Sequence, residues 1–223
     1  MKFPIKHRFS GDVICEIELD ASYENEPRSV QLGAAVKIAV SKNINLTGAD
    51  LAYANLAYAD LAYANLTDAN LAYANLAYAD LTDANLAYAD LANANLTDAN
   101  LAYADLTDAN LAYAKLTHAK LTHANLTGAN LTGADIAYAN LANANLAGQG
   151  LLQINGLRWP VLVTPEYLKI GCEQHSHDYW RSFDDRRILQ MAGKNAAEFW
   201  ADNKTWLLER CEWAAGFRKR GAT

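Results

Sequence analysis

The sequence predicts an all-β solenoid, a chain wound into stacked coils, with a smaller region at each end. From Leu46 to Leu151 every fifth residue is Leu, except for Ile136, through 22 consecutive units. From Ala49 to Ala144 the residue two positions before each of these is Ala, and both flanks lose this period. A fixed short period decides the architecture, because each repeat buries its apolar residues only against its neighbours.

A period of five excludes both a long helix and a long strand. A helix would spread Leu over every face, and a strand repeats every two residues. The period fits a three-residue strand with Ala inward, Asn or Asp outward and Leu inward, followed by a two-residue corner, as in Ala54-Asn55-Leu56-Ala57-Tyr58. Such coils stack at about 4.8 Å. Alternating small and large residues then fill a narrow lumen without voids.

The two corner residues follow a rule. Thr at the first corner position is always followed by Gly, Asp or His, whereas Ala is followed by Tyr, Asn or, once, Gly. One hypothesis is that two corner classes exist, because Gly, Asn and Asp tolerate a positive φ and a bulky Tyr does not. Recent duplication of one DNA cassette explains the rule equally well.

The motif A-[DN]-L-x-x resembles that of the pentapeptide-repeat family and matches almost without exception. The resemblance implies a right-handed quadrilateral β-helix with four pentapeptides per coil, so the 22 units would make about 5.5 coils and roughly 26 Å of length. Residues 20 apart would then stack: Tyr53 over Tyr73, Tyr58 over Tyr78, and Asn65 over Asn85. These external stacks should stabilise the repeat region. The four tyrosines are also candidates for a binding surface.

The N-terminal cap is predicted over residues 1–44, before a repeat region at 45–152. Residues 1–20 are expected to form a β-hairpin that turns at Ser10-Gly11-Asp12. Its alternating apolar residues are Val13, Cys15, Ile17 and Leu19. Ser29 is expected to cap a helix with apolar residues at helical spacing, namely Leu32, Ala35, Val36, Ala39 and Val40. The helix would cover the open backbone edge of the first coil.

The C-terminal cap is predicted over residues 153–223, with its own core, since all five Trp lie in the last third of the chain. Asn155-Gly156 predicts a hairpin between 151–154 and 157–159 that continues as a small meander. Two helices should follow. One comes after Asp184, with Ile188, Leu189 and Met191 and an end at Gly193; the other, over about 195–215, carries Phe199, Trp200, Trp206, Leu207, Cys211 and Trp213.

The flanks show a narrower resemblance. The start M-K-F-x-I-K-x-R-F-S-G and the later segments G-L-R-W-P-V, T-P-E-Y-L, I-G-C-E-Q-H and F-D-D-R-R-I are similar to the ends of a group of pentapeptide-repeat proteins in bacteria, phages and prophages. That group has no assigned activity. The resemblance therefore implies a bacterial or phage source and adds no catalytic residue.

Charge is unevenly placed along the chain. Between residues 46 and 151 there are ten Asp, two Lys and no Glu or Arg, which gives −8, so the flanks contribute +2 to the net charge of −6. Nine of these acids, from Asp50 to Asp108, precede the first base, Lys115. A repeat region with an acidic surface should repel nucleic acid and attract a basic partner.

Composition predicts a cytoplasmic protein without a membrane span. No apolar run reaches 18 residues, and the start of the sequence lacks a secretory apolar segment. The three cysteines are odd in number and far apart, which favours reduced thiols over a disulfide framework.

Candidate chemical sites are few. Cys172, His175 and His177 lie in a C-x2-H-x-H segment, but this spacing matches no standard zinc motif and has no second paired motif, so we expect a loop and no cofactor. A nucleophilic pair of Cys172 with His175 is an alternative that would need a lowered thiol pKa. A basic patch on two neighbouring sides of the repeat consists of Lys115, His118, Lys120 and His123, and it is either a solvated surface or a site for an acidic partner.

Two functions fit these features best, and an enzyme in the C-terminal cap is a third reading. The first is a non-enzymatic protein-interaction scaffold that presents a rigid acidic β-helix to an unidentified protein, with a possible homodimer through the C-terminal cap. The second is a DNA mimic that modulates a type II topoisomerase, as Qnr-type members of the family do. DNA carries one charge per about 1.7 Å, so a 26 Å mimic would need roughly 15 charges, against the −8 counted here.

Overall fold

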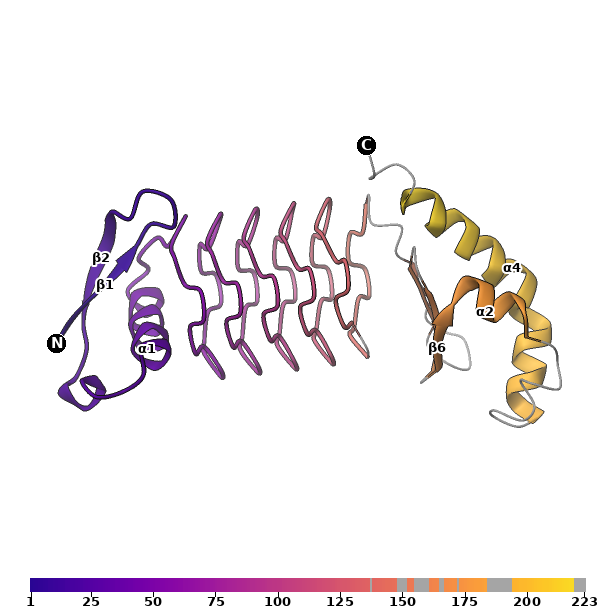
Figure 1. The fold of residues 1–223 in the computed structure, drawn as a ribbon, viewed down its shortest axis with the longest axis horizontal. Helices are drawn as coiled ribbons and strands as arrows, with labels where there is room; N and C mark the ends of the chain where they lie inside the picture. Colours follow the sequence, from indigo (N-terminus) through magenta and orange to yellow (C-terminus); the bar gives the residue numbers. More distant parts are fainter. Residues whose placement is uncertain are drawn as a thin grey trace. The chain divides into compact units, whose positions relative to one another are not determined.

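The computed structural model describes residues 1–136, 138–147, 152–154, 161–164, 167–171, 173–183 and 194–218. The chain forms two compact units, Met1–Asn145 and Leu146–Thr223 (Figure 1). The first unit contains a small α+β region and the repeat core, and the second contains a short sheet and helices. The three-part division of the chain at residues 44 and 152 stays a prediction.

The repeat core is a β-helix with twenty residues per coil. Parallel β-bridges pair residues 20 apart, from Asp50↔Asn70 to Asn125↔Asn145. Between two coils, Leu51 N–H donates to Asn70 O at 2.8 Å, and Asn70 N–H donates to Ala49 O at 2.8 Å. Four five-residue units therefore complete one coil, as the family resemblance implied.

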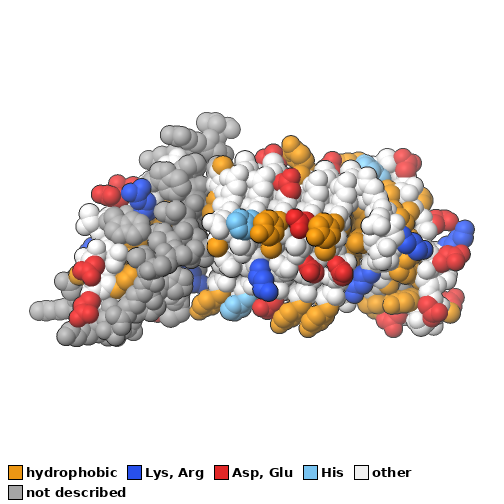
Figure 2. All heavy atoms as spheres, turned by 180° about the vertical axis from the view of Figure 1, so that it is seen from behind, with side chains coloured by type: hydrophobic (Ala, Val, Ile, Leu, Met, Phe, Trp, Pro, Cys, Tyr) orange, Lys and Arg blue, Asp and Glu red, His pale blue; other side chains and the backbone are white. Residues whose placement is uncertain are grey.

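Leucine and alanine fill the lumen of this β-helix. Each repeat Leu from Leu46 to Leu126 is at most 1% exposed, and each repeat Ala from Ala49 to Ala124 is at most 7% exposed. The prediction that Leu and Ala alternate toward the inside is confirmed. The outer surface carries rows of polar and aromatic side chains along the coils (Figure 2).

The prediction of two corner classes is wrong. The second corner residue has a positive φ whether it is Tyr53 at 62°, Asp68 at 61°, Asn93 at 59° or His118 at 60°. At Tyr53, Asp68 and Asn93 the residue is bound to the next coil, as in Tyr53, whose N–H donates to Ala72 O at 3.0 Å. The stacked coils impose one turn on every residue type, although a left-handed φ costs a bulky side chain about 1–2 kcal/mol.

Asn or Asp stands before most of the repeat leucines because its side chain closes the corner. Ala92 N–H donates to Asp90 Oδ1 at 3.0 Å, the local bond that favours Asn and Asp in turns. A Thr at the first corner position adds a second bond, from Thr97 Oγ1 to Asn95 Oδ1 at 2.7 Å. These bonds explain the outward Asn or Asp of the motif.

The N-terminal region contains a hairpin of β1 (Lys2–Lys6) and β2 (Val13–Glu18), a 3-10 turn (Ala21–Tyr23) and α1 (Arg28–Ser41). The hairpin is confirmed, but a register shift after Ile5 leaves Val13 51% exposed, so the predicted apolar face holds only from Ile17 onward. The predicted cap at Ser29 is wrong. Pro27 occupies the N-cap position and makes no side-chain capping bond, because its ring carries no acceptor, while its fixed φ suits the entry to a helix.

This region covers two of the four sides of the first coil. Asp50 N–H donates to Lys6 O at 2.8 Å, and Asn55 N–H donates to Ser29 O at 2.9 Å. Arg8 reaches further, with Nη1 donating to Asp68 O at 2.9 Å in the second coil. Edge groups that would otherwise pair with another chain are thus occupied, as predicted for this cap.

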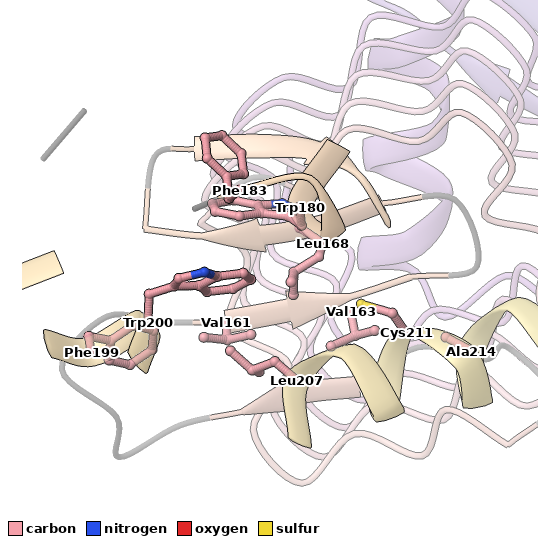
Figure 3. Close-up of a cluster of buried hydrophobic side chains, with 10 residues drawn as sticks. All are labelled: Val161, Val163, Leu168, Trp180, Phe183, Phe199, Trp200, Leu207, Cys211 and Ala214. Carbon is pink, nitrogen blue, oxygen red and sulfur yellow. The ribbon is translucent and has the colours of Figure 1, made fainter. Parts of the chain in front are cut away.

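The second unit contains an antiparallel sheet in the order β3 (Leu152–Ile154), β4 (Val161–Val163), β5 (Tyr167–Ile170) and β6 (Glu173–Ser176). Helix α2 (His177–Arg181) follows β6, and α4 is Lys194–Arg218. The buried core of this unit is drawn in Figure 3 and consists of Val161, Val163, Leu168, Trp180, Phe183, Phe199, Trp200, Leu207, Cys211 and Ala214. The predicted meander and long helix are confirmed.

Three details of the C-terminal prediction differ from the structure. Strand β3 pairs with 161–163, whereas the predicted partner 157–159 lies outside the described residues. Strand β6 and α2 occupy most of the segment that we expected to be a loop, because β6 pairs with β5 along its whole length. The helix predicted after Asp184 also lies outside the described residues.

Candidate interaction surfaces

Stacked tyrosines line the corners of the β-helix. The rings of Tyr53 and Tyr73 lie 5.1 Å apart at 6°, and those of Tyr58 and Tyr78 lie 5.0 Å apart at 3°. All four side chains are at least 53% exposed. Asp98, one coil further along, raises the pKa of Tyr78 through its negative charge and a hydrogen bond. The predicted stacks are present, and each leaves its outer edges open to a partner.

The stack of Tyr53 on Tyr73 should contribute to stability. We expect a double-mutant cycle with Tyr53→Asn and Tyr73→Asn to give a coupling energy of about 0.5–1.5 kcal/mol, because offset aromatic pairs are worth that much beyond burial. Asn suits the corner, since Asn93 already occupies the equivalent position one coil after Tyr73. The measurement is urea unfolding of the four proteins, and a coupling near zero would contradict the prediction.

Amide and carboxylate groups form ladders along the walls of the β-helix. A wall is one of its four sides, made of the equivalent five-residue units of successive coils. Asn70 Nδ2 donates to Asp50 Oδ1 at 2.9 Å, and Asn110 Nδ2 donates to Asp90 Oδ1 at 3.0 Å. A hydrogen bond from Thr82 is the largest of the effects that lower the pKa of the Asp80 carboxyl. The walls therefore hold their acids in fixed positions.

The basic patch of Lys115, His118, Lys120 and His123 lies on two neighbouring sides, as predicted, and all four side chains are exposed. Aromatic rings of adjacent coils stack on both histidines. His118 lies 5.0 Å from Tyr138, and His123 lies 4.9 Å from Tyr103.

The acids are not spread evenly over the walls. Two of them, Asp50 and Asp90, lie on one wall, and Asp68 and Asp108 stand at the corner beside it; we call these four residues the acidic side. Arg8 Nη1 lies 3.9 Å from Asp68 Oδ1 and partly balances this charge. By contrast, the next wall carries no acid before Asp135. A basic partner would therefore meet different charge on different sides.

In the part of the C-terminal Cys-His segment that the structure describes, the side chains are not grouped as a metal site. Cys172 lies outside the described residues. His175 Nε2 lies 3.2 Å from Glu173 Oε2, and the His177 side chain is buried in its own unit. Across the described parts of the chain, no group of three or more His, Cys, Asp or Glu is placed to hold a metal ion. The alternative pair of Cys172 with His175 stays untested.

The buried thiol of Cys211 should be unreactive. Desolvation by burial raises its pKa to about 11, so at pH 8 the thiol stays protonated and is a poor nucleophile. We expect iodoacetamide at pH 8 to leave Cys211 unmodified in native protein and to modify it in urea, as read by peptide mass spectrometry. Equal modification rates in both conditions would contradict this assignment.

Comparison with known families matches the repeat core. The model of pentapeptide repeats fits in eight copies over residues 44–81, 64–102, 74–112 and 109–148. The chain belongs to the pentapeptide-repeat family.

Solved pentapeptide-repeat structures resemble parts of this chain. HetL, involved in heterocyst differentiation regulation in the cyanobacterium Nostoc sp. strain PCC 7120, is 37% identical over 48% of this chain and 54% of HetL, with a TM-score of 0.30. A second Nostoc pentapeptide-repeat protein is 30% identical over 50% of this chain and 93% of that protein, with a TM-score of 0.32. QnrB1, a plasmid-mediated fluoroquinolone resistance protein, is 21% identical over 47% and 71%, with a TM-score of 0.27.

This pentapeptide-repeat chain spans about half the length of HetL. All three TM-scores are below 0.5, so family membership rests on the repeat motif. No curated protein matches the chain.

Sequence reasoning about this pentapeptide-repeat protein missed one hollow. A cavity of about 140 Å³ lies between the end of α1 and the first coil, lined by Val40, Asn43, Ile44, Asn45, Ala62, Tyr63, Ala64 and Asn65. Ligand pockets usually measure about 300–1,000 Å³, so this cavity is small for a substrate.

Among the described helices, none is long and apolar enough to cross a membrane.

Proposed function

We propose that this protein is a non-enzymatic interaction scaffold, in which a right-handed quadrilateral solenoid presents an acidic outer wall to a protein partner. The observation that carries the proposal is the division of side chains in the β-helix. Apolar residues fill the lumen, and the polar and aromatic residues stand outside on regular walls. Enzymes usually gather catalytic groups in a cleft, whereas the polar side chains of this β-helix are held apart along a regular surface.

The acidic side is the surface that best fits a basic partner. Asp50 and Asp108 are exposed, and Asp90 and Asp68 are half-buried with their carboxylates on the outer surface. Ladder bonds from Asn70 and Asn110 fix two of these carboxylates, so little side-chain entropy is lost on binding. Complementary charge then steers association and sets partner choice.

The test is affinity capture with the full chain from a lysate of the cells that produce it. We expect Asp50→Asn/Asp90→Asn to reduce capture of a specific protein by about tenfold at low salt, because two charges facing the partner are lost. The matched control is Asp60→Asn/Asp105→Asn, which makes the same change on other walls. Asn is already the motif's alternative at these positions, so the fold should be preserved. Equal capture by all three proteins would overturn the proposal.

A DNA mimic acting on a type II topoisomerase is the second candidate, favoured by the charge of −8 between residues 46 and 151. The acids lie on several walls, whereas a mimic needs them where it docks. No inhibition or quinolone protection in a gyrase supercoiling assay at micromolar protein would rule out the DNA mimic.

We also propose a cytoplasmic location, supported by the free thiols of Cys15 and Cys211.

A further inference from the structure

One wall of the β-helix has a charge pattern that is complementary to itself. It carries one outward residue per coil, in the order Asp60, Asp80, Asn100, Lys120 and Asn140, and parallel bridges join each residue to the next. We call it the Asn100 wall after its central residue. Asp60, Lys120 and Asn140 are exposed, and the two between them are half-buried.

A second copy that faces this wall in antiparallel orientation brings opposite charges together. If a two-fold axis passes through Asn100, Lys120 of each copy lies opposite Asp80 of the other, and Asn140 lies opposite Asp60. Equal spacing of the coils keeps both pairs in register. A parallel arrangement would instead set Asp60, Asp80 and Lys120 each against its own copy, which is unfavourable at every charged position.

The corner that follows the Asn100 wall has the same complementarity. Its outward residues include Asp83, Tyr103 and His123, one per coil, and all three are exposed. In the antiparallel arrangement His123 lies opposite Asp83 of the other copy, and Tyr103 meets its own equivalent.

The corner that precedes the wall adds aromatic contacts. There Tyr58 would lie opposite Tyr138, and Tyr78 opposite His118. The three tyrosines are 74%, 56% and 53% exposed in the order Tyr58, Tyr138 and Tyr78. The arrangement has one unfavourable opposition, Asp98 against its own copy, so Asp98→Asn should tighten the contact.

No other wall has this property about an axis through its central residue; on one of them Lys115 would meet Asp135 of the other copy only about an axis midway between these two residues, near the end of the repeats. On the wall of Asn55, Asn75, Asn95, Lys115 and Asp135 the same operation sets Lys115 against Asn75. The wall of Asp50 and Asp90 has no base, and the wall of Asp105 has none either. Figure 2 shows a face of the β-helix on which acidic, basic, histidine and hydrophobic side chains alternate in rows along the coils.

We propose that two copies of this chain associate antiparallel through their Asn100 walls, with reciprocal Lys120–Asp80 pairs. An isologous contact of this kind uses each pair twice and closes as a dimer. It also lets a chain of net charge −6 associate through a wall on which a base of each copy faces an acid of the other. The inference is independent of the proposed basic partner, whose surface lies on a different wall.

The test is light scattering of the full chain at rising concentration in low salt, where the monomer mass is 24.4 kDa. Lys120→Glu and Asp80→Lys should each weaken dimerisation by at least about tenfold, because each creates two like-charge oppositions. The double variant should restore the dimer to within about threefold. Lys115→Glu is the matched control, since it reverses the same charge in the same coil on the neighbouring wall.

Cross-linking gives a second readout that does not depend on charge. In a background with Cys15→Ser and Cys172→Ser, Asn100→Cys should form a dimer with a short bis-maleimide, because this position lies on the two-fold axis. Asn95→Cys on the neighbouring wall should not, although each change removes a comparable ladder bond, at 3.2 Å for Asn100 and 3.3 Å for Asn95. A monomeric mass at 200 μM in low salt would overturn the proposal, as would a dimer that Lys120→Glu leaves intact.

Discussion

Replacing Leu91 by Ala is expected to lower the free energy of unfolding by about 2–5 kcal/mol, as for other buried leucines truncated to Ala. Leu91 is fully buried in the lumen, between repeat leucines of the coils on either side. The lumen cannot collapse onto the gap, because the backbone is held by ladder bonds such as Leu91 N–H to Asn110 O at 2.7 Å. Urea unfolding of the full chain, followed by circular dichroism, measures the change.

Tyr88→Phe provides the control for Leu91→Ala. Tyr88 lies at the corner just before Leu91 in the sequence and is 57% exposed, so loss of its hydroxyl should change stability by less than about 0.5 kcal/mol. If Leu91→Ala cost no more than Tyr88→Phe, the leucines would not form a packed lumen, and the assignment of inside and outside would be wrong.

The inside of the β-helix was predictable because each residue there carries its own signal. Leu and Ala recur at fixed offsets, and only a turn after every fifth residue places them all on one surface. The number of units per coil is different. The period of five does not determine the number of units per coil, whereas the bridges between residues 20 apart show it directly.

Corner conformation was not predictable from residue type. Tyr at a positive φ contradicts local preference, and ladder bonds to the adjacent coil decide the outcome. The same reason accounts for β6, whose Glu173-Gln174-His175-Ser176 sequence has weak strand character by itself. Pairing with β5 supplies the missing preference.

The candidate surfaces were predictable in part. The stacks of Tyr53 on Tyr73 and Tyr58 on Tyr78 follow once residues 20 apart are aligned, and they are present. The cavity beside α1 was not predictable, because it depends on where the helix ends relative to the first coil. Contacts between an irregular cap and a regular core carry no sequence period.

Gly33→Ala is expected to displace α1 from the first coil and to lower the free energy of unfolding by about 1–3 kcal/mol, the usual cost of overpacking. A methyl group at Gly33 would lie 1.9 Å from Asn55 O, which is backbone and cannot rotate away. The helix must move, and the bond from Asn55 N–H to Ser29 O is then strained or lost. Thermal unfolding and hydrogen exchange at Asn55 measure the two consequences.

Gly216→Ala separates this contact from the general effect of adding a methyl group to a helix. Gly216 lies in α4, and among the described residues no atom beyond the helix's own nearby backbone stands within 4 Å of the added carbon. There the substitution should stabilise the helix by about 0.5–1 kcal/mol, since Ala has the higher helix propensity. Opposite signs at the two glycines would show that Gly33 is required by the close approach of α1 to the β-helix. Stabilisation at both positions would mean that α1 does not lie against Asn55.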